Sequence, residues 1–301
     1  MKNGYYIFYY HDISSNEIIP NNIKTSIERF KNEINYIKNN FQIFSLKDGI
    51  KYALANKKLT NRIASICFDD GFYSILKNAM PVLDKAKIKS TIFVCESCLK
   101  DENHWLDSII IYNLFRKKQL KELETYYNYK FKSNNLGSFL RIYSDKNLTK
   151  MLTKLRKKYL KKKKIYLSYD DLNKLNPEIF DIGCHTKNHF YLSNLSLAEQ
   201  KNEVDCSIIM KRKNYVDILA IPYGDKGSYN DNTLSIISQK FFNIILTGSG
   251  GINHKLNLKQ PIFERIALNN NKKNIEIHIQ ERLKSRKFNN FLSSLISRIN
   301  N

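Results

Sequence analysis

Short apolar runs and amphipathic stretches alternate along most of the chain. Apolar residues at steps of three and four predict a helix over residues 22–39, and related patterns predict helices over 47–55, 73–86 and 197–213. Apolar runs bounded by polar residues predict strands. These strands are expected near residues 5–10 and at 42–46, 62–68, 90–95, 177–183, 216–221, 241–247 and 261–268. Such alternation is typical of an α/β fold, here a closed or nearly closed (β/α) barrel of about 7–8 parallel strands.

The alternation breaks over residues 101–168, where the spacing of leucines, isoleucines and tyrosines predicts an inserted helical subdomain. We therefore expect the barrel in two parts, residues 1–100 and 169–283, with the insertion between them as the element that selects the substrate. Residues 284–301 are predicted to form a basic amphipathic helix. This helix would pack onto the barrel or lie on an anionic membrane surface.

Two neighbouring carboxylates follow the central strand. Asp69 and Asp70 come directly after the apolar run at residues 62–68 and precede Gly71. Adjacent side chains of an extended segment point to opposite sides, so one carboxylate can bind a cation while the other faces a different group. The spacing does not decide which acid does which, and a solvated turn is the alternative.

Two histidines follow the strand expected at residues 177–183. His185 and His189 are four residues apart, a spacing that places two imidazoles on one side of a helical or tight turn. A pair of this kind can hold one metal ion, so we predict that both residues are metal ligands.

Together these stretches resemble the polysaccharide deacetylases of carbohydrate esterase family 4. The resemblance covers about residues 5–268 apart from the insertion. It is carried by Phe68-Asp69-Asp70-Gly71, His185-Thr186-Lys187-Asn188-His189, Ile221-Pro222-Tyr223-Gly224 and Tyr10-His11-Asp12-Ile13. It implies a distorted (β/α) barrel with its site at the carboxyl ends of the strands.

The resemblance also implies roles for the residues of the site. Asp69 would be the general base, and Asp70, His185 and His189 would hold a divalent metal, in the first place Zn²⁺, with Co²⁺, Ni²⁺ or Mn²⁺ as alternatives. The backbone N–H of Tyr223 would help to hold the oxyanion.

The chain also departs from the family pattern. Ala220 stands where the family often has an arginine that braces the base, so Arg265 is expected to supply that cation from a later strand. The late histidine that would protonate the leaving amine has no clear counterpart. His254, His278 and His11 are the candidates.

Three residues are expected to contact the substrate, namely Pro222, His11 and Trp105, the only tryptophan. At the mouth of a carbohydrate site Trp105 could stack on a sugar face, and a buried anchor is the alternative.

Composition and charge add little to these expectations. The net charge of +22 favours anionic surroundings, although a biased coding composition would produce the same excess. Basic residues spread along the chain without a recognised binding motif argue against nucleic acid. The five cysteines are odd in number and are expected to be reduced. Without an apolar leader near the first residue, we expect a cytoplasmic protein, peripheral at the inner membrane surface if the last helix binds lipid.

The site residues, together with what the resemblance implies, predict a metal-dependent hydrolase of amide bonds, an N-deacetylase acting on a polysaccharide or its sugar precursor. The alternatives are release of a formyl or other acyl group, or a catalytically weakened barrel that binds polyanions or membranes.

Overall fold

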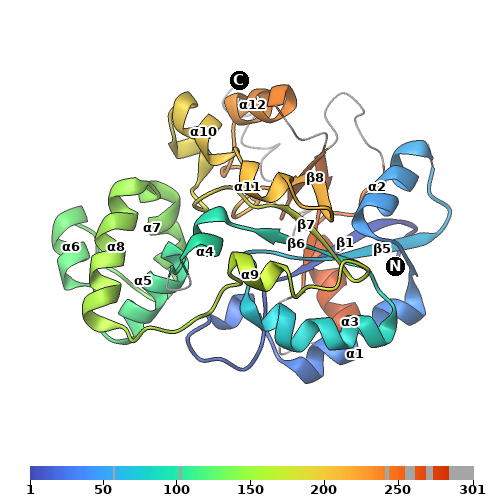
Figure 1. Ribbon diagram of the computed structural model, residues 1–301, viewed down its shortest axis with the longest axis horizontal. Helices are drawn as coiled ribbons and strands as arrows, with labels where there is room; N and C mark the ends of the chain where they lie inside the picture. The colour runs from blue at the N-terminus through green and yellow to red at the C-terminus, as the bar shows by residue number, and fades with distance from the viewer. Residues whose placement is uncertain (57, 102–103, 241–243, 255–261, 269–273, 285–301) are drawn as a thin grey trace.

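The computed structural model describes residues 1–301 except 57, 102–103, 241–243, 255–261, 269–273 and 285–301, which are drawn as a grey trace in Figure 1. The amphipathic helix predicted for residues 284–301 lies, apart from its first residue, outside this part of the chain. Among the described residues, no helix has the length and apolar character needed to cross a bilayer.

The centre of the protein is a nearly closed, barrel-shaped sheet of parallel strands (Figure 1), as the sequence predicts. Eight strands follow one another in the order β10-β9-β8-β7-β6-β5-β1-β11, and β4 pairs with β5 at the side. Their bounds are β1 Gly4–Tyr10, β4 Gln42–Ile43, β5 Arg62–Phe68, β6 Ser90–Val94, β7 Phe180–Cys184, β8 Tyr215–Ala220, β9 Ile244–Thr247, β10 Ile262–Glu264 and β11 Ile266–Ala267. Residues 63–68 are all buried, which is why β5 reads as a continuous apolar run.

The single strand predicted for residues 261–268 is wrong, because the chain divides here into two strands. β10 pairs with β9, whereas β11 pairs with β1 at the other end of the strand order. Only Arg265 separates the two strands. One short segment thus contributes the strand at each end of the strand order, β10 and β11. Arg265 lies between these two strands.

Helices surround the barrel, and three predicted helices have different bounds. The helix expected at residues 22–39 begins only at Ile27, because the Ser26 side chain caps its first turn. Residues 73–86 contain a π-helical segment before α3, and residues 197–213 form two helices instead of one. The helices around the barrel are α1 Ile27–Asn40, α2 Leu46–Ala55, α3 Met80–Ala86, α10 Leu197–Glu203, α11 Ser207–Met210 and α12 Asp231–Lys240.

Four helices lie within the described part of residues 101–168, the stretch that was predicted to be a helical insertion. They lie together at one side of the barrel, at the left in Figure 1. Phe139 is buried at their centre, with its ring packed against those of Tyr127, Phe131 and Tyr143. Their buried side chains join the core of the barrel in one apolar cluster. The helices are α5 Asp107–Arg116, α6 Lys121–Tyr127, α7 Leu136–Tyr143 and α8 Lys146–Tyr159.

The expectation that all five cysteines are reduced is wrong for one pair. Cys184, the last residue of β7, forms a disulfide with Cys206, which lies between α10 and α11. Their Cα atoms are 6.2 Å apart, within the usual range for this bond. Cys67, Cys95 and Cys98 are free and buried.

Candidate metal centre

Two adjacent acids leave the end of β5 in different directions. The Asp69 N–H continues the pairing with β1 by donating to the Tyr10 carbonyl, at an N···O distance of 2.9 Å. Asp70 has a φ of 66°, in the left-handed region that a residue with a side chain seldom adopts. Both carboxylates are buried, with exposed fractions of 3% and 4%. The left-handed turn at Asp70 therefore sets the direction of its carboxylate, while Asp69 still belongs to the end of the strand.

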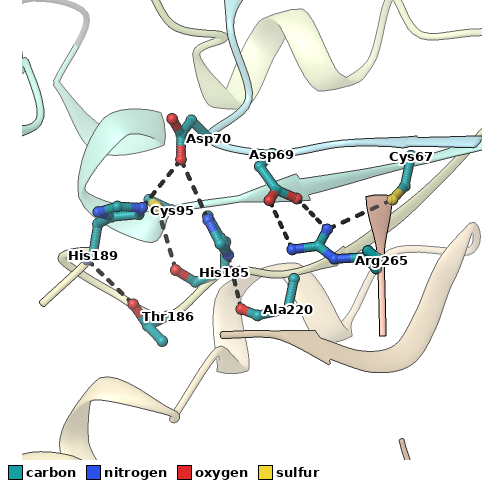
Figure 2. Close-up of polar contacts among 9 residues, drawn as sticks. All are labelled: Cys67, Asp69, Asp70, Cys95, His185, Thr186, His189, Ala220 and Arg265. Atoms are coloured by element: carbon teal, nitrogen blue, oxygen red, sulfur yellow. Dashed lines mark hydrogen bonds and ion pairs between the residues drawn. The ribbon is translucent and has the colours of Figure 1, made fainter. Parts of the chain in front are cut away.

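Asp70 faces both predicted histidine ligands, as Figure 2 shows. Its Oδ1 atom lies 3.3 Å from Nε2 of His185 and 3.3 Å from Nε2 of His189. The ligand atoms of all three residues lie within 4.8 Å of one another. The structure thus brings together the three residues that the sequence predicted as a metal site.

The local hydrogen bonds fit a metal ion held at this point. His185 Nδ1 lies 2.8 Å from the Ala220 carbonyl and can donate its proton there, so Nε2 keeps its lone pair toward Asp70. Asp70 Oδ1 is buried and makes no hydrogen bond of acceptable geometry with the described residues. One oxygen and two imidazole nitrogens suit zinc and similar divalent ions.

Asp69 belongs to a different interaction. Arg265 donates from Nη1 to Oδ1 at 2.7 Å and from Nη2 to Oδ2 at 2.8 Å, and its side chain is 1% exposed (Figure 2). Burial alone would raise the pKa of Asp69, but Arg265 and His185 outweigh it, so the pKa lies below its ordinary value. Asp69 is therefore an ionised carboxylate in a fixed orientation, and Arg265 is the cation expected from the later strand.

Backbone strain concentrates around the site. Seven non-glycine residues among those described have positive φ angles, and four of them are Asp70, Thr186, His189 and Tyr223. Each such conformation costs free energy that the surrounding contacts must offset. At His189 the backbone N–H donates to Thr186 Oγ1 at 3.1 Å, which stabilises the turn that points its ring at Asp70.

The turn after β8 lies against the histidines. The rings of Tyr223 and His189 have their centroids 4.8 Å apart, while Pro222 is buried. The Tyr223 N–H has no acceptor among the residues that the structure describes. Gly224 follows with a φ of 66°, and a Cβ atom there would lie 2.4 Å from the backbone nitrogen of Gly248. Only glycine fits at position 224 of this turn. The turn therefore holds the Tyr223 N–H as a donor that is not used within the described protein.

The candidate acids lie in different places. Burial lowers the pKa of His11, although the charges of Asp69 and Asp70 are close enough to oppose this effect. The Nδ1 atom of His11 is buried and has no hydrogen-bond partner in the described chain. His254 packs against Gly4 at the opposite end of β1. His278 lies 2.8 Å from the Ala267 carbonyl through Nε2. His11 is thus the candidate that the site's charges reach.

The substrate contact expected at Trp105 does not fit the structure. Its side chain is 2% exposed, Nε1 donates to the Lys163 carbonyl at 2.8 Å, and the Arg156 guanidinium lies 5.7 Å from the ring centroid. A buried indole of this kind has no face open to a sugar. Trp105 is instead an anchor at the start of the insertion.

We expect Trp105→Ala to lower the free energy of unfolding by about 3–5 kcal/mol, because it removes a large buried ring. Urea denaturation measures this change, and kcat/KM measured where the variant is folded should stay at the wild-type value. Trp105→Phe, which keeps most of the packing, should lose far less stability. A lower kcat/KM with unchanged stability would instead restore the sugar-stacking role.

The sequence did not reveal which residues of the insertion reach the site. The Ser144 hydroxyl, just after α7, accepts the Tyr191 N–H at 3.3 Å, and the Tyr191 ring packs on that of Tyr223 with centroids 5.3 Å apart. Arg141 of α7 forms an ion pair of 2.8 Å with Asp225, in the loop after β8. These contacts join segments far apart in the chain, so no local pattern signals them.

Comparison with solved structures identifies the architecture. IcaB from Ammonifex degensii superposes with a TM-score of 0.60 over 93% of this chain and 96% of its own, at 15% identity. Streptococcus pyogenes deacetylase PplD gives a TM-score of 0.58 over 89% and 93%, at 18% identity. The chain has the polysaccharide deacetylase fold. The barrel fold that the resemblance implied is thereby confirmed.

Sequence comparison points the same way over a shorter stretch. Poly-β-1,6-N-acetyl-D-glucosamine N-deacetylase of Staphylococcus aureus (strain MSSA476) is 34% identical over 117 residues. The matched stretch spans 38% of this chain and 38% of that relative, well under half of either protein. No family model matches the chain.

Proposed function

We propose that this protein is a metal-dependent carbohydrate N-deacetylase that hydrolyses the N-acetyl amide of a polysaccharide. One observation carries the proposal: the Asp70, His185 and His189 cluster lies beside an ionised Asp69 that Arg265 holds in place. Both groups lie where the central strands of the barrel end, the edge at which active sites of such barrels form. The name of the S. aureus relative supports an N-acetylglucosamine polymer as the substrate class.

Asp70, His185 and His189 would hold the metal ion, with Zn²⁺ as the first expectation. Bound there, a divalent ion acidifies water and polarises an amide carbonyl. Asp69 is the general base, because it is ionised, is excluded from the ligand cluster and keeps its orientation through two hydrogen bonds to Arg265. It accepts the proton of the water that attacks the acetyl carbon.

Two further groups act on the carbonyl oxygen and on the nitrogen of the amide. The Tyr223 N–H donates to the oxygen on which negative charge develops, from a turn whose geometry Gly224 secures. His11 passes the proton that Asp69 has accepted to the sugar nitrogen as the C–N bond breaks, because a buried imidazole with a lowered pKa carries no extra proton of its own. Its position beside Asp69 and Asp70, with a buried and unpartnered Nδ1, supports this role.

Removal and restoration of the metal tests the proposal. We expect a chelator to abolish acetate release from N-acetylated β-1,6-linked glucosamine oligomers and added Zn²⁺ or Co²⁺ to restore it. His189→Ala should lose bound metal and should not be rescued. Formate release from N-formylated oligomers, measured in parallel, distinguishes a deformylase. Acetate release that persists after complete metal removal would contradict the proposed function.

A further inference from the structure

A groove crosses the surface of the helical insertion between α6 and α8, with a cavity volume of about 470 Å³. We call it the α6/α8 groove. Its lining includes Tyr126, Tyr127, Asn147, Lys150, Met151 and Lys154. Nothing in the mechanism above uses these residues, so the groove needs its own explanation.

The lining combines an aromatic face with hydrogen-bond donors. Tyr126 is 70% exposed, and its ring meets that of Tyr127 edge to face at a centroid distance of 4.8 Å. An exposed aromatic ring offers an apolar face for the C–H side of a sugar ring, while Asn147 and Lys150 can donate to hydroxyl and acetyl oxygens. This combination suits a carbohydrate better than an apolar peptide.

The charge of the groove selects between forms of the same polymer. Lys150 and Lys154 are exposed and make no salt bridge with the described residues. Glu122, the acid in the lining, is neutralised by Lys158 at 2.9 Å. The groove is therefore positive, and it should repel the ammonium groups of deacetylated units and accept neutral N-acetylated ones.

A chain of contacts connects the groove to the metal centre. Tyr127 packs against Tyr143 of α7 with ring centroids 4.6 Å apart. The next residue, Ser144, accepts the Tyr191 N–H. The Tyr191 ring packs on Tyr223, and the Tyr223 ring packs on His189. The helices that line the groove thus pack, through α7, against the residues that surround the metal centre.

We propose that the α6/α8 groove is a distal carbohydrate subsite that binds N-acetylated units of the substrate polymer, a few sugars away from the amide that is hydrolysed. The proposal rests on the proposed function. It makes the insertion the element that favours long, acetylated chains over short or already deacetylated ones, because contacts at two places on one polymer raise its affinity.

Acetate release from N-acetylated β-1,6-glucosamine oligomers of increasing length tests the subsite. Tyr126→Ala should lower kcat/KM for the long oligomers about fivefold to tenfold, through KM, and leave the shortest active oligomer unaffected. Ile142→Ala is the control, because it removes an exposed apolar side chain of α7 outside the groove. It should leave kcat/KM unchanged for both the long and the shortest active oligomers. An equal effect of Tyr126→Ala on short and long oligomers, or no effect, would overturn the proposal.

A binding measurement separates failure of the subsite from failure of the proposed function. Calorimetric titration of the Asp69→Asn protein compares fully acetylated with partly deacetylated long oligomers. We expect tighter binding of the acetylated form, and loss of that preference in the Lys150→Glu/Lys154→Glu variant. Lys146→Glu/Lys157→Glu makes the same charge change on α8 outside the groove and should keep it. Equal behaviour of the two double variants would overturn the proposal, whether or not the protein releases acetate.

Discussion

Asp69→Asn is expected to lower kcat for acetate release roughly a thousandfold while the protein keeps its full content of bound metal. The amide has the shape of the carboxylate and can still accept one hydrogen bond from Arg265, but it cannot take a proton from water. Asp70, His185 and His189 are untouched by the change. Steady-state kinetics and metal analysis of the same purified sample measure both quantities.

The matched control is Asp181→Asn. Asp181 lies on β7 near its start, away from the metal centre, and pairs with Lys89 at 3.0 Å. This variant should release acetate at the wild-type rate. Loss of metal from Asp69→Asn would show that Asp69 is a ligand, and a normal kcat would assign the base to another residue.

Local patterns were sufficient to predict the parts of the site that are close in sequence. Residues 63–68 are all buried, so the apolar character of this run revealed both the strand and the acids at its end. His185 and His189 lie on one turn, and their spacing was enough to pair them. The spacing could not distinguish Asp69 from Asp70. What separates them is the left-handed turn at Asp70 together with the approach of Arg265, which is 196 residues from Asp69.

Features that depend on distant pairing could not be predicted in the same way. Residues 261–268 look like one strand because both halves are apolar, yet β10 and β11 add to opposite ends of the strand order. The sequence left Trp105 as either a sugar-stacking side chain or a buried anchor, and the Lys163 carbonyl and Arg156 that cover it come from later in the insertion. Contacts of this kind depend on the tertiary fold and produce no repeating pattern of apolar residues in the sequence.

Arg265→Met is expected to lower the free energy of unfolding at pH 7 by about 3–5 kcal/mol, because it leaves the buried Asp69 carboxylate without its cation. Arg265 is the largest side chain among those that are fully buried, and it also lies 4.4 Å from the Tyr9 ring centroid. Methionine fills much of the same volume, so the loss reports mainly the orphaned charge. Arg141→Met breaks the exposed ion pair with Asp225 and should cost at most about 1 kcal/mol.

The pH dependence separates the charge effect from packing. In the wild-type protein the pKa of Asp69 is lowered, so its ionisation stabilises the fold above the unfolded pKa, and this contribution is lost as the pH falls through the folded pKa. Without Arg265, burial raises the pKa of Asp69 above its unfolded value, and ionisation then opposes folding. The stability difference between the two proteins should therefore shrink as the pH falls from the raised pKa toward the lowered one.

Denaturation of both proteins across this pH range, together with the Asp69→Asn/Arg265→Met double variant, completes the test. The double variant has no carboxylate to leave unpaired, so it should be more stable at pH 7 than Arg265→Met alone. A stability loss that is the same at every pH and persists in the double variant would mean that Arg265 acts through packing. A stability loss that disappears when Asp69 is also replaced would show that Arg265, which lies between β10 and β11, stabilises the ionised Asp69 carboxylate within the barrel.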